Sequence, residues 1–384
     1  MKPPEVTRDG EIEAARPVTM RHIAERCGVT TATVSLALRQ DARLSAATIA
    51  RVQAVALELG YDRSQNQAAR RMVMRRYGRD VVNQMIAVFL PRYFYKANYF
   101  AHLMEGIMDA LTEHDFNPVI VELGLGGDPR PLPPVFPNSE VDGVIMYGGG
   151  ALPARLRAAQ GFGQRPIVSV ILPAEECSLV AADDEYGAYL ATTHLLELGH
   201  RHFQSWFNEN NGGAVMAIRR AGVLRALREW QLDPAVHLHD AAWYMGTIIP
   251  PFHLALPDAD HRDNTGFRQE VQDEYIRYMR AHPEITAILA SNDAYARRIW
   301  YLLRREGWRI PDDISIVGYD DTDPMPDEHG LNILTSVHLP LVEVGRGAGE
   351  QIIDSVLNHV ALAPRLVLPP TLQVRASTAP AKRG

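Results

Sequence analysis

Hydrophobic positions near the N-terminus recur every three or four residues, which is the period of amphipathic helices. The first such segment begins after Thr19, a candidate N-cap, and ends before Gly28, a residue that readily closes a helix in a left-handed conformation. Its apolar positions are Met20, Ile23, Ala24 and Cys27. The spacing therefore predicts a short helix followed by a glycine-containing turn.

Two more helices are predicted directly after this turn. Thr30 can cap a helix over residues 31–38, and Ser45 can cap a third helix that ends at Gly60. The apolar positions expected to be buried are Val34 and Leu38 in the second helix and Ile49, Val52, Ala56 and Leu59 in the third. Helix, short turn and helix is the layout of a helix-turn-helix motif.

Short side chains gather at the N-terminal end of the second predicted helix. They are Thr30, Thr31, Ala32, Thr33 and Ser35. Such side chains let a helix approach base edges closely, and a threonine or alanine methyl group can contact a thymine methyl group. The pattern favours a DNA-reading helix, and a plain three-helix subdomain with a threonine-rich exposed face is the alternative.

From residue 85 onward, short apolar runs alternate with segments of helical period. The predicted strands are residues 85–90, 118–123, 141–147, 166–171, 179–182, 203–207, 286–290, 314–318 and 334–337. The predicted helices include residues 100–114, 186–198, 217–230, 293–306 and 342–358. This alternation predicts parallel sheets covered on both faces. We expect an α/β body of two doubly wound parallel-sheet lobes, with ligands binding at the carboxyl ends of the strands.

Charge distribution separates the head from the body. The 384 residues carry a net charge of −7 and are 46% hydrophobic, which is ordinary for a globular protein of two or three units. Residues 17–76 contain ten arginines and four acidic residues, so this segment is +6 and the rest of the chain is −13. A basic head on an acidic body is expected where only the head meets phosphate, and a chance cluster of solvated arginines is the alternative.

Cysteine usage and hydropathy bear on the compartment. Cys27 and Cys177 lie far apart in the sequence, which argues against a disulfide framework and favours a reducing compartment. Residues 1–16 are polar and lack the apolar core of a secretory signal, and no apolar run is long enough for a membrane span. We expect a cytoplasmic protein without a membrane partner, with a disordered tail over residues 1–17.

Residues 18–61 resemble the head of the LacI/GalR (lactose-repressor) family, through the pattern T-hydrophobic-x-x-I-A-x-x-x-G-V-[ST]-x-x-T-V-S. His22 departs from the family, which usually has aspartate there. The resemblance implies that the operator-dependent contacts come from Thr31, Ala32 and Leu36. It implies contacts to phosphate or flanking bases for Thr30, Thr33, Ser35, Arg39, Arg43 and Ser45. Thr19 and Met20 complete the DNA-binding set of this predicted domain, residues 18–62.

Residues 63–83 correspond to the family's hinge, which becomes helical on the operator and inserts a leucine pair into the minor groove. Here Arg63-Ser64 replaces the usual Pro-Asn start, and Met72 stands where the leucine should be. Methionine can serve as an apolar wedge, and Arg70 suits a narrow, negative minor groove. A flexible basic linker that binds phosphate without kinking the DNA is the alternative.

Residues 84–380 resemble the family's effector-binding and dimerisation domain and the periplasmic sugar-binding proteins that share its fold. The resemblance rests on VDGVI at 141–145, DDEYGA at 183–188, HLLELGHR at 194–201, ASND at 290–293, IPDDISIVGYDD at 310–321, LTSV at 334–337 and RASTAP at 375–380. Residues 233–268 match poorly. The resemblance implies a homodimer that binds a pseudo-palindromic operator in double-stranded DNA.

A ligand site between the two lobes is implied by the same resemblance. Arg219, in an Arg-x-x-Gly pattern, matches the family's main ligand-binding arginine, and Asp293 follows a strand in the manner of carboxylates that bind sugar hydroxyls. Tyr99 and Phe100 could stack on a sugar or base. Tyr147, Asp184 and Asp320 complete the predicted rim. The alternatives are that Asp293 caps its helix, Asp320 braces a loop and Tyr99 is a core residue.

Enzymatic and metal-binding patterns were weighed against this interpretation. The glycine run 148–150 follows a strand, but a G-x-G-x-x-G loop would need glycine where Pro153 stands. The pairs His200/His202 and His237/His239 have no third ligand at metal-site spacing. We therefore expect no catalytic residues, cofactor or metal. The prediction is a repressor controlled by a small effector, a sugar or sugar derivative; an α/β enzyme or a solute-binding protein with an added basic helical domain is the alternative.

Overall fold

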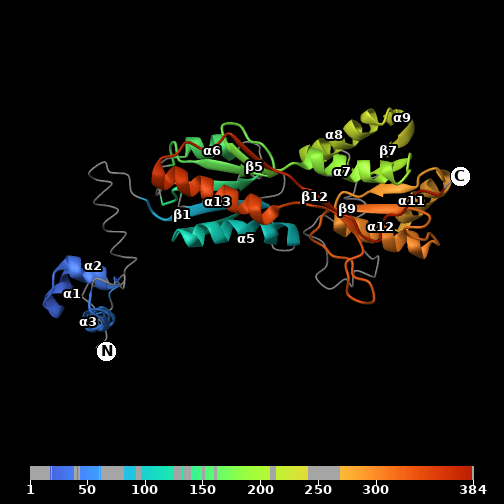
Figure 1. The fold of residues 1–384 in the computed structure, drawn as a ribbon. Coiled ribbons are helices and arrows are strands. Elements are labelled where there is room, and N and C mark those ends of the chain that lie inside the picture. The colour runs from blue at the N-terminus through green and yellow to red at the C-terminus, as the bar shows by residue number, and fades with distance from the viewer. Residues whose placement is uncertain are drawn as a thin grey trace, which may run out of the picture. The chain divides into compact units, whose positions relative to one another are not determined.

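The computed structural model describes residues 18, 20–38, 41, 44–59, 61, 82–91, 97–123, 132, 136, 140–148, 152–159, 162–207, 213–240 and 269–382. The chain divides into two compact units, Met1–Asn83 and Gln84–Gly384, called here the head and the body (Figure 1). Five predicted DNA-binding residues and one side chain lie outside the described part: Thr19, Arg39, Arg43, Arg70, Met72 and the side chain of Ala32.

The head contains the three predicted helices, α1 (Met20–Cys27), α2 (Thr31–Leu38) and α3 (Ala46–Glu58). Ile23, Val34 and Val52, one from each helix, are fully buried at its centre. Gly28 has a φ of 66°, so it closes α1 in the left-handed conformation that its position predicted. The third helix ends at Glu58 and not at Gly60.

Side-chain caps and one ion pair fix the ends of these helices. Thr30 Oγ1 accepts from the backbone N–H of Thr33 at 3.1 Å, and Ser45 Oγ accepts from Thr48 at 3.2 Å. Arg26 pairs with Glu58 at 2.7 Å and ties α1 to α3.

The expected burial of α2 needs one correction. Ala37 is fully buried and Leu38 only partly, because Ala37 shares the inward face with Val34 at a spacing of three residues.

The first sheet of the body has the strand order β11-β5-β4-β3-β1-β2 and is entirely parallel. Its strands are β1 (Met85–Pro91), β2 (Asn117–Leu123), β3 (Gly143–Tyr147), β4 (Ile167–Val170), β5 (Ser178–Ala182) and β11 (Arg365–Leu368). One face packs against α5 (Asn98–Glu113) and α13 (Leu341–Asn358), and the other packs against α6 (Leu152–Ala158). This is the predicted doubly wound arrangement.

The second sheet has the order β12-β10-β9-β8-β6-β7. Its strands are β6 (Phe203–Ser205), β7 (Leu238–Asp240), β8 (Ala287–Leu289), β9 (Ser315–Asp320), β10 (Thr335–His338) and β12 (Thr371–Gln373). Its helices are α7 (Asp184–Glu197), α8 (Ala214–Glu229), α9 (Pro234–His237), α11 (Gln269–Ala281) and α12 (Asp293–Arg305). The β10–β12 pair is antiparallel, which departs from the all-parallel expectation.

In each sheet the first strand lies between the second and the third strand in chain order. The strand order therefore reverses between β1 and β3 in the first sheet and between β6 and β8 in the second. The chain passes between the lobes three times, from β5 to α7, from β10 to α13 and from β11 to β12. Ligands of such sheets bind beyond the carboxyl ends of the strands at these reversal points. None of the helices in the described part of the chain is long and apolar enough to cross a membrane.

Helices α5 and α13 touch backbone to backbone through glycines on both sides. A Cβ atom on Gly345 would lie 2.1 Å from the carbonyl oxygen of Leu103, and one on Gly106 would lie 1.8 Å from that of Val342. No side chain can rotate away to relieve either contact, because the obstructing atoms belong to the backbone. The packing of the first lobe therefore depends on glycine at these positions.

We predict that Gly345→Ala lowers the free energy of unfolding by about 1–3 kcal/mol, because the added methyl group forces the two helices apart. Gly347→Ala on the same helix is the matched control, since its Cβ would meet only the ends of side chains, Leu366 at 3.1 Å and Val180 at 3.5 Å. Urea unfolding followed by circular dichroism measures both variants. Equal stabilities for the two variants would contradict the close contact.

Candidate functional site

Arg219 of α8 lies at the centre of a buried polar cluster with 3% of its surface exposed. Its Nε donates to Asp184 at 2.7 Å, Nη2 donates to Asp320 at 3.0 Å, and Nη1 donates to the carbonyl oxygen of Ser291 at 2.7 Å. The guanidinium also lies over the Tyr319 ring, 3.7 Å from its centroid. Each nitrogen of this cation thus donates to one acceptor, and one face of the guanidinium meets an aromatic ring.

Local sequence places these groups together. Asp184 begins α7 directly after the chain crosses from β5, and Asp320 is the last residue of β9, with a φ of 88°. Gly222 lets α8 approach α7, because a Cβ there would lie 2.0 Å from the carbonyl oxygen of Glu185. The glycine of the Arg-x-x-Gly pattern therefore brings Arg219 within reach of Asp184.

Charge in this cluster is unbalanced, since one buried arginine faces two buried carboxylates. Burial is the main cause that raises the pKa of Asp320, Asp184 adds to the increase and Arg219 opposes it. The resulting pKa is about 6. Burial alone would lower the pKa of Arg219, but Asp184 and Asp320 outweigh it and raise that pKa, so the arginine stays charged. The cluster therefore offers both donors and a carboxylate that can take up a proton near pH 6.

Aromatic side chains of the first lobe border this cluster. Tyr99 and Phe100 of α5 and Tyr147 at the end of β3 form an edge-to-face series with ring centroids 5.2 and 5.1 Å apart. Burial raises the pKa of Tyr147 to about 12, and Asp184 and Asp320 contribute to the increase. The three rings pack against a buried hydrophobic cluster that includes Tyr319 of the second lobe, so residues of the two lobes meet here.

Asp293 accepts hydrogen bonds from the turn after β9 and from β10. Its carboxylate accepts from the Ser336 hydroxyl and from the backbone N–H groups of Thr322 at 2.8 Å and Asp323 at 3.3 Å. The N-cap of α12 is Asn292, so helix capping is not the role of Asp293. The contacts hold the turn after β9, which carries the arginine-binding Asp320.

The same turn also contacts the first lobe. Asn98 at the start of α5 donates through Nδ2 to the carbonyl oxygen of Thr322 at 3.2 Å and to Asp323 Oδ1 at 3.1 Å. This link places the braced turn between the buried cluster and α5. Nothing in the sequence pattern marked Asn98.

Sequence reasoning also missed Ser291 and Tyr319 as contacts of Arg219. Both lie inside segments that carried the family resemblance, ASND and IPDDISIVGYDD. Ser291 contributes a backbone oxygen and Tyr319 a ring face, and neither is marked by its residue type.

The described DNA-binding candidates lie on the surface of the head or at its edge. Thr31 is exposed at the start of α2, and Thr30 and Ser45 are exposed at the caps of α2 and α3. Thr33, Ser35, Leu36 and Met20 are half-buried. Two helix N-termini with short, exposed side chains offer donors to phosphate and room to approach base edges. Their roles in DNA binding stay predictions.

Comparison with known proteins agrees with both units of this structure. Residues 19–64 match the model of bacterial regulatory proteins of the lacI family, and residues 192–378 match that of the periplasmic binding protein-like domain. The chain is 28% identical over 372 residues, 95% of its length, to the whole of the HTH-type transcriptional regulator CelR from Thermobifida fusca. The chain thus joins a lacI-family regulatory domain to a periplasmic binding protein-like domain, and its relatives are transcriptional regulators of this kind.

Two solved structures have folds similar to that of this regulator. A complex of the transcriptional regulator CelR with cellobiose has a TM-score of 0.57 at 23% identity and covers 94% of this chain and 99% of its own. The lac repressor dimer bound to operator and an anti-inducer has a TM-score of 0.64 at 20% identity, with 95% and 100% covered. The protein is thus a DNA-binding transcriptional regulator with a periplasmic-binding-protein-like body.

We predict a pH-dependent stability difference between the wild type and Asp320→Asn. The folded state holds the Asp320 proton more tightly than the unfolded chain, since its pKa is about 6 against 3.8. The resulting stability is full below pH 4 and is lost as the pH rises to about 6. Urea unfolding of both proteins should show the wild-type advantage falling by up to about 3 kcal/mol over that range. A difference that stays level or increases with pH would refute the shift.

Proposed function

We propose that this protein is a cytoplasmic homodimeric repressor of the LacI family whose operator binding is controlled by a sugar or sugar derivative bound between the two lobes. The observation that carries the proposal is Arg219 bound by Asp184 and Asp320 beside the tyrosines of the first lobe. The proposed domains are a DNA-binding head over residues 18–62, a hinge over residues 63–83 and an effector-binding body over residues 84–380.

The chemistry of this cluster suits a polyhydroxylated ligand. A sugar hydroxyl both donates and accepts hydrogen bonds, so it can accept from an N–H of Arg219 and donate its O–H to Asp184 or Asp320. Tyr99 and Phe100 supply ring faces and edges for the apolar side of a sugar ring. The relative CelR, solved with cellobiose, is a regulator with a sugar ligand.

Control of DNA binding follows from the position of this cluster between the lobes. A ligand that replaces the contacts of Arg219 with the carboxylates changes the second lobe at Asp184, directly after one crossing segment, and the three crossing segments carry that change to the first lobe. The head is proposed to respond through the hinge, with the two heads of a dimer on two half-sites. Coupling of this kind typically amounts to about 1–3 kcal/mol.

Replacing Arg219 tests the effector site. A thermal-shift screen of the full chain against pentoses, hexoses, disaccharides, sugar phosphates and nucleosides identifies a ligand, and calorimetry gives its Kd. We expect Arg219→Lys to weaken binding at least tenfold, because lysine cannot make the forked contacts of a guanidinium. The neighbouring Arg220→Lys, which alters an outer ion pair with Asp240 at 2.6 Å, should leave the Kd unchanged. An equal Kd for the wild type and Arg219→Lys would show that Arg219 does not bind the ligand.

Replacing Thr31 tests base reading by α2. Fluorescence anisotropy with the DNA that flanks the protein's own gene should locate a pseudo-palindromic site. Thr31→Ala should weaken binding to that site about three- to tenfold and leave binding to unrelated duplex unchanged, because only base contacts are lost. Leu57→Ala, an exposed side chain on α3, is the control in the same head. Equal affinity of the wild type for every duplex would contradict the proposal.

A further inference from the structure

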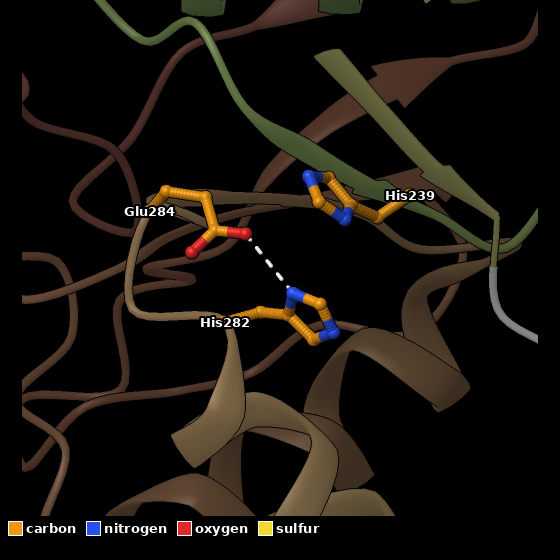
Figure 2. A group of neighbouring side chains, drawn as sticks. All are labelled: His239, His282 and Glu284. Carbon is orange, nitrogen blue, oxygen red and sulfur yellow. Dashed lines mark hydrogen bonds and ion pairs between the residues drawn. The ribbon is translucent and has the colours of Figure 1, made fainter. Parts of the chain in front are cut away.

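Three potential metal-binding side chains from two separate segments of the chain converge at the edge of the second sheet. His239 lies on the edge strand β7, and His282 and Glu284 lie in the turn between α11 and β8. Figure 2 shows the three side chains directed toward a common space, with the His282–Glu284 contact drawn as a dashed line. The spacing of residues in the sequence offered no third ligand to the pair His237/His239, whereas the fold brings His282 and Glu284 to His239.

Distances in this group are close to those of a metal site. One potential ligand atom from each residue lies within 4.8 Å of the other two, and His282 Nδ1 is 3.0 Å from Glu284 Oε1. Ligand atoms about 2.0–2.1 Å from a tetrahedral zinc ion lie roughly 3.3 Å from one another. The His282–Glu284 pair is therefore near its final spacing, and rotation of the half-buried His239 ring closes the remainder.

We propose that His239, His282 and Glu284 form a binding site for a divalent transition-metal ion of the zinc type. Two imidazoles and one carboxylate are a ligand set that zinc uses, with a fourth position left for water. Imidazole nitrogen favours zinc, copper or nickel over magnesium and calcium, which prefer oxygen ligands. The site is accessible to ions, since the side chains of His282 and Glu284 are 37% and 38% exposed.

Surrounding groups can orient the His239 ring and keep it able to bind. The Tyr278 hydroxyl lies 3.4 Å from His239 Nδ1, and His202 Nδ1 lies 3.5 Å from its Nε2, so either nitrogen can bind metal while the other keeps a partner.

This site is separate from the proposed effector site. His282 and Glu284 precede β8 and His202 precedes β6, so the group lies toward the amino ends of these parallel strands. Asp293 and Asp320 lie at the carboxyl ends of β8 and β9. A metal bound at this edge would connect β7 to the α11–β8 turn without touching the Arg219 cluster.

His200 and His202, the other closely spaced histidine pair, have different surroundings. His200 is buried, and its ring nitrogens lie 2.8 Å from Thr286 Oγ1 and 3.1 Å from Ser315 Oγ. Those contacts occupy both nitrogens, so His200 is a packing residue. His202 borders the proposed site.

Zinc binding to the chelator-treated full chain tests the proposal without reference to DNA or effector. Equilibrium dialysis with zinc should give one tightly bound ion that requires this group. We expect His239→Ala/His282→Ala, and separately Glu284→Gln, to weaken zinc binding by at least about tenfold. His329→Ala is the matched control, because His329 also contacts a neighbouring carboxylate, that of Glu328 at 3.5 Å, and is exposed. It should bind zinc as the wild type does.

Cobalt provides a second readout that depends on the ligand set. Cobalt bound here should give visible absorption bands of a four- or five-coordinate ion, and these should be lost in His282→Ala, whose fold is checked by circular dichroism. Zinc binding that is absent in the wild type, or equal in the wild type and the His239/His282 double variant, would overturn the proposal. The group would then be a hydrogen-bonded histidine cluster only.

Discussion

The buried contacts of Arg219 are the constraint on which the second lobe depends where the chain enters it from the first. A guanidinium in the interior requires compensation on every side, and here two carboxylates, one carbonyl oxygen and one aromatic ring supply it. Asp184 begins the first helix after a lobe crossing, and Asp320 ends a strand, so a single side chain ties two topologically distinct points together. Removing the cation would leave two buried carboxylates without a partner.

Support for this ion cluster comes from polar groups that do not touch Arg219. Asp293 accepts two backbone N–H groups and one hydroxyl from the turn after β9 and from β10, and Asn98 reaches that turn from the first lobe. The Tyr319 hydroxyl donates to the Asp184 carbonyl oxygen at 2.8 Å beneath the guanidinium. Because these contacts fix the backbone around Asp320, a ligand that changes the cluster acts on a stiff frame and not on a loose loop.

The second lobe has two chemically different ends. Asp320 at the carboxyl end of β9 binds Arg219 of α8, and these groups suit hydroxyl ligands, whereas imidazoles lie around His239 toward the amino ends of the strands. Parallel strands make this separation possible, because every connection returns a helix across the sheet and leaves one set of turns at each end. One lobe can thus carry an effector site and a metal site with no shared side chain.

The sequence by itself determined the head, the class of the body and most of the residues at the lobe junction. Periodicity located α1, α2 and α3 because their caps and apolar positions are local signals, and the same held for the longer helices of the body. The short strands β7, β11 and β12 and the helices α9 and α11 were not predicted. The three strands and α9 have at most four residues, so sheet edges and packing specify them and not their own pattern, whereas α11 has 13 residues and its helical period was missed.

Tertiary structure alone decided what each site residue contacts. Arg219 was expected to bind a ligand, but that it is held by Asp184 and Asp320 depends on the approach of α8 to α7 at Gly222. The role of Asp293 in bracing a turn, and the meeting of His239 with side chains from another segment, were equally beyond sequence spacing. Residue types establish which chemistry is available, whereas the distances that make it a site arise only when strands far apart in the chain become neighbours in a sheet.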